Sequence, residues 1–308
     1  MKKLIFGAIF LMVSLLILSG CINKSVQDNV NKSDKLTVAV SIFPIFDIVK
    51  QVAGDKIDTT LILSPGSSPH TYEITPTEVK KLQGAELLIV TGLGIDDWIL
   101  NVANSIPGST VFDLSKFVKL QEYNLQGANH IPDPDEQGNQ IYDPHYWLEP
   151  NNAIIIAETI EKKFSELDPE NAGYYEESAQ TFIDKINFQD KVWTSKLNKI
   201  QQKDILVFHD AWGYFADHFG LFIAASFEPF PVQEPTPKYL KELQDIVNEK
   251  KIKTIFVEPQ LSTQSISALA KDLGVSINVL DPLGGVNGRN SYIELIDFNV
   301  NNIYDLLK

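Results

Sequence analysis

Apolar and polar positions follow two different periods along the first half of the chain. Short apolar runs, typical of buried strands, are found at 36–41, 58–63, 86–90 and 111–114. Segments with helical apolar spacing follow three of these runs, at 45–52, 75–82 and 95–102. Because strands that alternate with helices form parallel sheets with helices on both faces, this half predicts an α/β lobe.

The second half of the chain repeats this alternation. Its strand candidates are 205–208, 221–226, 254–257 and 275–280. Its helix candidates are 212–219, 236–247, 262–273 and 292–307. The same argument predicts a second lobe, so the predicted fold class is α/β with two lobes, each a parallel-type sheet flanked by helices.

A long helix is predicted between the two lobes. Asp168-Pro169-Glu170 favours a helix start, because it supplies an N-cap residue, a first-turn proline and an acid. No further proline occurs up to Ile200, and Gly173 is the only glycine. A rigid helix of about thirty residues, roughly 45 Å long, fits this stretch. The predicted boundaries are 36–167 for the N-terminal lobe, 168–200 for the linking helix and 201–308 for the C-terminal lobe.

Residues 1–20 have the pattern of an export signal. Lys2 and Lys3 precede an apolar stretch, Leu4 to Leu18, that is short for a membrane span and typical of a signal-peptide core. An uncleaved membrane anchor is the alternative. Cleavage would leave a polar tether without apolar periodicity up to residue 35.

Cys21 is the only cysteine of the chain. Its position after Leu18-Ser19-Gly20 resembles the lipobox of bacterial and archaeal lipoproteins, in which the thiol is lipidated; a free thiol is the alternative. A lipid at Cys21 would hold the tether 21–35 at the outer face of the cytoplasmic membrane. With one thiol, an intramolecular disulfide and a multi-cysteine zinc site are excluded, so a metal must use His, Asp or Glu.

The chain is strongly acidic, with a net charge of −14 at pH 7. This charge disfavours nucleic acid and anionic lipid as partners and raises the local concentration of cations. The segment 122–143 breaks the strand–helix pattern. It is rich in Asn, Gly, Pro and acids and carries one histidine, His130, so it is predicted to be an acidic surface loop.

Candidate metal ligands lie beside the predicted elements. His70, His209 and Asp281 each follow a predicted strand, and His145 precedes a predicted helix. In an open parallel sheet, ligands bind beyond the carboxyl ends of the strands. Each residue alone has a structural explanation, as a hydrogen-bonding histidine or an Asp-Pro turn, and His218 is interpreted as a structural or surface residue. The joint placement of two candidates per lobe indicates a metal site in a shared cleft.

Several sequence blocks surround these residues. They are Pro65-Gly66-x-x-Pro69-His70-x-Tyr72-Glu73, Asp143-Pro144-His145-x-Trp147, His209-Asp210-Ala211, Glu234-Pro235-Thr236-Pro237, Phe256-Val257-Glu258-Pro259-Gln260 and Asp281-Pro282-Leu283-Gly284. Together the blocks resemble the zinc/manganese solute-binding proteins of ABC transporters over nearly everything after the tether. The resemblance implies four metal ligands between two lobes joined by one long helix: His70, His145, His209 and Asp281.

The resemblance also implies a function. We expect a monomeric, non-catalytic receptor that captures a divalent metal and delivers it to an ABC importer permease in the membrane. Three imidazoles and one carboxylate suit tetrahedral Zn²⁺, whereas Mn²⁺ prefers more oxygen ligands. Manganese members of the family usually carry a carboxylate in place of His209. Zinc is therefore predicted, with manganese or ferrous iron as alternatives. Many zinc members carry a long histidine-rich loop before the Asp-Pro-His block, whereas this chain has one histidine there, which weakens the prediction of zinc slightly.

Four carboxylates could accept hydrogen bonds from the ligand histidines, or could be caps and surface charges. They are Glu73, Glu149, Glu234 and Glu258. A secreted zinc hydrolase with Glu149 or Glu258 as base is a second hypothesis. Two observations disfavour a hydrolase. Four protein ligands would leave no coordination position of the zinc open for water, and His-Glu-x-x-His and Gly-x-Ser-x-Gly motifs are absent from the sequence. An adhesin is a third hypothesis, which the sequence does not support directly.

Overall fold

The structure, a computed structural model, describes residues 35–122, 142–228, 236–260 and 263–308. The signal peptide 1–20, the lipidation site Cys21, nearly all of the tether, the acidic loop between residues 122 and 142, and Glu234 lie outside the described residues. The chain from Lys35 to Lys308 forms one compact unit. None of the described helices is both long and apolar enough to cross a bilayer.

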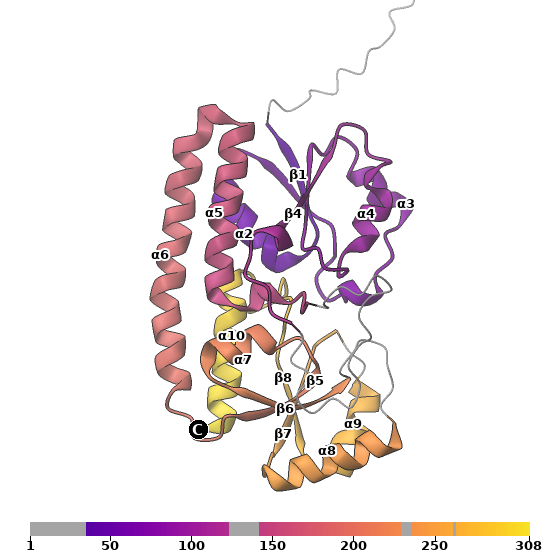
Figure 1. Ribbon diagram of the computed structural model, residues 1–308. Helices are drawn as coiled ribbons and strands as arrows, with labels where there is room; N and C mark the ends of the chain where they lie inside the picture. Colours follow the sequence, from indigo (N-terminus) through magenta and orange to yellow (C-terminus); the bar gives the residue numbers. More distant parts are fainter. Residues whose placement is uncertain (1–34, 123–141, 229–235, 261–262) are drawn as a thin grey trace, which may run out of the picture. The chain divides into compact units, whose positions relative to one another are not determined.

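The first lobe is built on a parallel sheet (Figure 1). In the described residues, its strands are β1 (Thr37–Val40), β2 (Asp58–Leu61), β3 (Leu87–Val90) and β4 (Thr110–Asp113), in the order β2-β1-β3-β4. Its helices include α2 (Phe43–Ala53), α3 (Pro76–Lys81) and α4 (Asp97–Ala103). All four residues of β3 are buried, as expected of a strand covered on both faces. The predicted cap of α3 is present, because Thr75 and Glu78 form a capping box.

The second lobe repeats this arrangement. In the described residues, its strands are β5 (Asp204–His209), β6 (Phe222–Glu228), β7 (Thr254–Val257) and β8 (Ser276–Val279), in the parallel order β6-β5-β7-β8. The helices α7 (Gly213–Phe219), α8 (Pro237–Glu249) and α9 (Thr263–Leu273) belong to this lobe. The predicted α/β fold with two lobes is thus confirmed.

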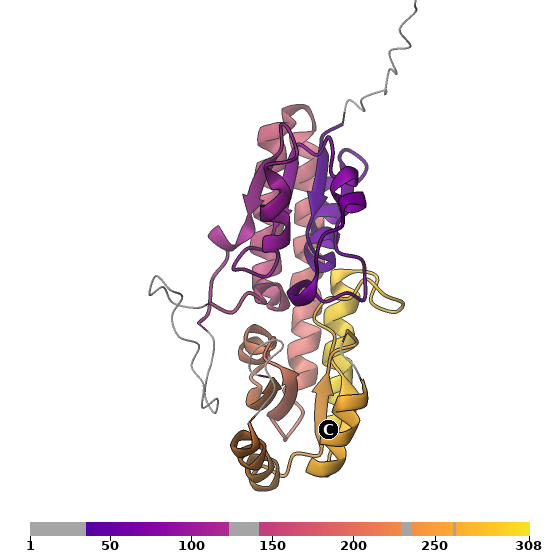
Figure 2. The same cartoon turned by 90° about the vertical axis from the view of Figure 1, so that its right-hand side faces the viewer.

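The predicted linking helix is α6 (Ala172–Leu197), preceded by a short 3-10 turn at Pro169–Asn171. It packs against α2, α5 (Pro150–Leu167) and α10 (Tyr292–Leu307), and both views show α10 beside α6 (Figures 1 and 2). Trp193 of α6 is fully buried and donates from Nε1 to Asp297 of α10 at 3.2 Å. The linking helix is therefore held along its length by helices on either side of it in the sequence.

The buried side chains form two clusters. The larger one joins the first sheet, α2, α5, α6 and α10 to one face of the second sheet. The smaller one lies between the other face of the second sheet and α8 and α9. Along β5, Ile205 and Val207 belong to the larger cluster and Leu206 and Phe208 to the smaller, which is the period of two expected of a strand. One continuous core therefore reaches from the first lobe into the second.

The strand ends of the second sheet carry polar residues. β5 ends at His209, Glu258 directly follows β7, and Asp281 follows β8. Because all strands of the sheet are parallel, these residues lie at the same, carboxyl edge of it. The fold thus directs chemistry-bearing side chains to one edge of the second lobe.

Candidate metal centre

Three histidines from distant parts of the chain meet in the structure. One ring nitrogen from each of His70, His145 and His209 lies within 4.8 Å of the other two. The ring centroids are 5.0 to 5.4 Å apart, and the Nε2 atoms of His70 and His145 are 3.3 Å apart. In the described residues, this is the one group of His, Cys, Asp or Glu side chains close enough together to hold an ion.

Local backbone structure positions each of the three histidines. His70 lies in a 3-10 turn at Pro69–Thr71 that follows a bend at Gly66, whose φ of +88° favours glycine. His145 immediately precedes the 3-10 turn Tyr146–Leu148, and its backbone N–H donates to Asp143 at 2.9 Å. His209 is the last residue of β5 rather than the first beyond it.

Two of the rings are oriented by carboxylates. Nδ1 of His145 lies 2.7 Å from Asp143 Oδ1, and Nδ1 of His209 lies 2.9 Å from Glu258 Oε1. An Nδ1–H that donates to a carboxylate leaves Nε2 as the free lone pair and raises its basicity. Asp143 was not predicted from the sequence. Its place two residues before a histidine was the available signal, but an Asp-Pro pair is equally typical of a turn.

The cavity between the rings is small, and some of the polar atoms that line it lack hydrogen-bond partners among the described residues. Its volume is about 10 Å³, and its lining includes Trp147, Gln260 and Leu283. Two buried polar atoms of lining residues, His209 Nε2 and Gln260 Oε1, have no hydrogen-bond partner among the described residues. Buried polar atoms without partners are costly, and a cation bound to the carbonyl oxygen and to the unprotonated ring nitrogen would satisfy both. The space suits a single ion.

Burial sets the protonation of the rings. Burial, then the proximity of His145 and His209, lowers the pKa of His70 to about 2, and burial also lowers the pKa of His145. Burial opposes a charge on His209 too, but the Glu258 carboxylate outweighs it and raises the pKa of this ring. Burial raises the pKa of Asp143 to about 7. His70 and His145 are therefore neutral near neutral pH, which is the form that binds metals.

The fourth predicted ligand, Asp281, is close to this cavity but is not part of the histidine group. Its side chain is fully buried. Oδ1 accepts hydrogen bonds from Gln260 Nε2 and from the backbone N–H groups of Leu283 and Gly284, at 3.0 to 3.1 Å. Oδ2 lies 3.0 Å from Arg289 Nε. The Asp281 carboxylate is thus held by Gln260, by two backbone N–H groups and by Arg289.

The remaining predicted carboxylates are placed differently from one another. Glu258 contacts His209, Glu73 is exposed, and Glu149 lies beside His218 rather than beside a histidine of the group. Glu234 lies outside the described residues.

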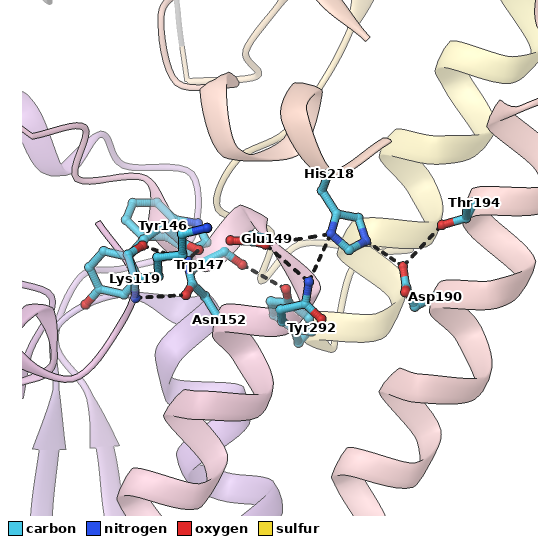
Figure 3. Close-up of polar contacts among 10 residues, drawn as sticks. Lys119, Tyr146, Trp147, Glu149, Asn152, Asp190, Thr194, His218 and Tyr292 are labelled. Carbon is cyan, nitrogen blue, oxygen red and sulfur yellow. Dashed lines mark hydrogen bonds and ion pairs between the residues drawn. The ribbon is translucent and has the colours of Figure 1, made fainter. Parts of the chain in front are cut away.

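His218 forms a second polar cluster. Figure 3 shows it extending from α7 toward Asp190 of α6 and Glu149 at the start of α5. Nε2 lies 2.7 Å from Asp190 Oδ1, Nδ1 lies 3.8 Å from Glu149 Oε1, and the side-chain amide of Asn151 is 3.4 Å from Nδ1. Burial would lower the pKa of His218, but the hydrogen bond to Asp190 and the nearby Glu149 outweigh it and raise the pKa to about 9. His218 of α7 is thus a charged residue whose contacts connect α7 to α6 and to the start of α5.

Comparison with known proteins identifies the same fold and a family. The sequence model of the family described as "ZnuA: Zinc-uptake complex component A periplasmic" matches residues 38–306. A solved structure named "Crystal structure of ZnuA" superposes with a TM-score of 0.77 at 26% identity, covering 89% of this chain and 100% of that one.

Two curated relatives are similar over nearly the whole chain. The high-affinity zinc uptake system protein ZnuA of Bacillus subtilis is 27% identical over 98% of this chain and 97% of its own length. The zinc-binding lipoprotein AdcA of Streptococcus pneumoniae is 28% identical over 92% of this chain. The match covers 57% of the length of AdcA, so this chain corresponds to a little over half of that relative.

Proposed function

The chain belongs to the family of zinc-uptake complex component A, and from this premise we propose that it binds Zn²⁺ outside the cytoplasm and delivers it to the permease of an ABC importer. The observation that carries the proposal is the meeting of three imidazoles in an ion-sized, buried cavity. The Nε2 of His209 supports it further, because it is a buried ring nitrogen that has no hydrogen-bond partner among the described residues.

The proposed ligands are the ring nitrogens of His70, His145 and His209, with the Asp281 carboxylate as the fourth. Three imidazole nitrogens and one oxygen favour zinc over manganese, which prefers oxygen-rich sites. Asp143 and Glu258 hold two of the rings in the tautomer that presents Nε2. Both curated relatives described above carry zinc in their names.

We place the protein at the outer face of the cytoplasmic membrane, anchored by a lipid on Cys21. The name of one relative includes the word lipoprotein, and the sequence before Cys21 has the pattern of a lipoprotein signal. The anchor would keep the receptor near its permease while the polar tether allows it to move.

The proposed role is non-catalytic. A catalytic zinc keeps a position open for water and needs room for its substrate, whereas the cavity here holds about 10 Å³. Turnover of peptide, ester or phosphate substrates that depends on added zinc would favour a hydrolase over a receptor.

The test is metal binding by the protein that begins at Cys21, with its lipid site replaced by serine. Wild type should bind about one Zn²⁺ and prefer it to Mn²⁺ in competition. His70→Ala, His145→Ala and His209→Ala should each lower zinc affinity more than about a hundredfold, because removing a direct ligand exceeds the effect of removing its support. His218→Gln, which lies outside the histidine group, is the matched control and should bind as wild type. Unchanged affinity in all three alanine variants would contradict the site.

A further inference from the structure

An ion pair is buried beside the histidine group. Asp281 is fully buried, and the side chain of Arg289 is 14% exposed. Asp281 Oδ2 lies 3.0 Å from Arg289 Nε, yet neither atom makes a hydrogen bond of good geometry among the described residues. The pair is therefore held by charge more than by directed bonding. A buried carboxylate needs such a countercharge, because a buried charge without a partner destabilises the fold strongly.

Arg289 is presented to Asp281 by its own loop. Gly285 N–H donates to Arg289 C=O at 2.9 Å, and Arg289 N–H donates to Val286 C=O at 2.8 Å, which closes a tight turn. The guanidinium carbon lies 4.3 Å from the centre of the Phe298 ring, within cation–π range. The turn and the ring together hold the guanidinium near the carboxylate.

The same loop touches the first lobe. A Cβ at Gly285 would lie 2.9 Å from Phe43 and 3.0 Å from Pro65, so the loop backbone packs closely against both. Pro65 lies in the segment that leads to His70. Trp147, two residues beyond His145, donates from Nε1 to Pro282 C=O at 2.8 Å. The loop around Asp281 is thus in contact with the segments that carry two of the histidines.

Asp281 is adjacent to the cavity without reaching it. Pro282 and Leu283, the next residues along the chain, line the cavity, and so does Gln260, which donates to Asp281 Oδ1. Within the described part of the chain, Oδ2 is the carboxylate oxygen that accepts no hydrogen bond, so a cation could bind it with the smallest loss of hydrogen bonds. The partner lost in that exchange is Arg289.

We propose that Arg289 is a positioning residue that competes with the metal ion for Asp281. In the metal-free protein the guanidinium holds the carboxylate; on binding, Asp281 Oδ2 exchanges the guanidinium for the ion, and Arg289 turns toward solvent. No bond other than the coordination bond is made, and the charge of the carboxylate is balanced in both states. This inference rests on the proposed function, with Asp281 as the fourth ligand.

The exchange has a thermodynamic consequence. Arg289 stabilises the metal-free state only, so it weakens zinc binding and gives the carboxylate a partner to return to when the ion leaves. Without Arg289, the metal-free protein would keep a buried carboxylate with no countercharge, which destabilises that state. Zinc binding would relieve this destabilisation, so the affinity for zinc would rise. A residue that merely supported the fold of the site would have the opposite effect, because its loss would weaken binding.

The experiment compares Arg289→Gln with wild type, in the full mature protein. We expect Arg289→Gln to bind zinc at least about tenfold more tightly, to release it more slowly to a chelator, and to show a lower melting temperature without zinc but a larger rise with it. In an Asp281→Asn background the same substitution should leave zinc affinity unchanged. Unchanged or weaker affinity of folded Arg289→Gln, or an equal effect with Asp281→Asn, would overturn the proposal.

A second variant keeps the test decisive if Arg289→Gln does not fold. Arg289→Lys keeps the charge but loses the planar fork and part of the cation–π contact, so it should bind zinc a few times more tightly than wild type. Affinity equal to or weaker than wild type in this variant would also overturn the proposal. If wild type itself does not bind zinc, the proposed function fails; if wild type binds and the Arg289 variants do not differ from it, this inference alone fails.

Discussion

At the scale of single residues, the sequence indicated the three histidines that meet but not two residues that hold the predicted ligands, Asp143 and Arg289. His70, His145 and His209 could be singled out because they lie beside predicted elements within recognisable sequence blocks. Asp143 and Arg289 could not, because the roles of both depend on which side chain lies opposite. No period or spacing encodes the 2.7 Å contact of Asp143 with His145, or the contact of Arg289 with Asp281.

Asp143 provides a prediction at this scale. Asp143→Asn should lower zinc affinity by about tenfold to a hundredfold, because an amide is a weaker acceptor for the His145 Nδ1–H than a carboxylate and leaves Nε2 less basic. Affinity can be measured by competition with a fluorescent chelator. Glu258→Gln, which changes the equivalent contact of His209, should show a loss of similar size. Wild-type affinity in both variants would mean that the two carboxylates do not support the rings.

At the scale of elements, the sequence predicted which segments are strands and helices better than where they end. The helix expected over 168–200 is α6 (Ala172–Leu197). Asp168 precedes a short 3-10 turn instead, and its side chain makes no capping hydrogen bond but accepts from the side chains of Asn171 and Tyr175. The strand expected at 58–63 ends at Leu61, so His70 follows a longer connection than expected. Such ends depend on side-chain partners, which apolar periodicity does not record.

The contacts of His218 with two other helices give a prediction about the pH dependence of stability. Asp190 of α6 and Glu149 at the start of α5 raise its pKa to about 9, above its ordinary value of 6.5. A raised pKa in the folded state means that the stabilisation is complete below pH 6.5 and is lost as pH rises through about 9. His218→Gln should therefore lower the unfolding free energy by up to about 3 kcal/mol in mild acid, with a difference that shrinks in alkali.

Urea unfolding of metal-free protein at several pH values would measure this difference. Asp190→Asn should reproduce most of the loss, and the double variant should be little worse than either single variant, because the residues act as a pair. If the difference in unfolding free energy between His218→Gln and wild type stayed constant or grew as pH rises, the stabilising charge on His218 would be contradicted.

At the scale of the whole molecule, the alternation of strands and helices predicted two α/β lobes, and the structure has them. The sequence did not predict the order of strands in each sheet, β2-β1-β3-β4 and β6-β5-β7-β8, because the same alternation is compatible with many orders. It also did not predict that one buried cluster continues from the first sheet through α6 into the second lobe. That continuity depends on contacts such as Trp193 with Asp297, which join segments far apart in the chain.

The most direct measurement is the position of the ion in crystals of the zinc-loaded mature protein, located by anomalous scattering at the zinc absorption edge. We expect a single peak within about 2.0–2.1 Å of one nitrogen of each of His70, His145 and His209, with Asp281 turned from Arg289 toward the ion. A zinc peak elsewhere in the molecule, or no bound zinc beside these three rings, would contradict it.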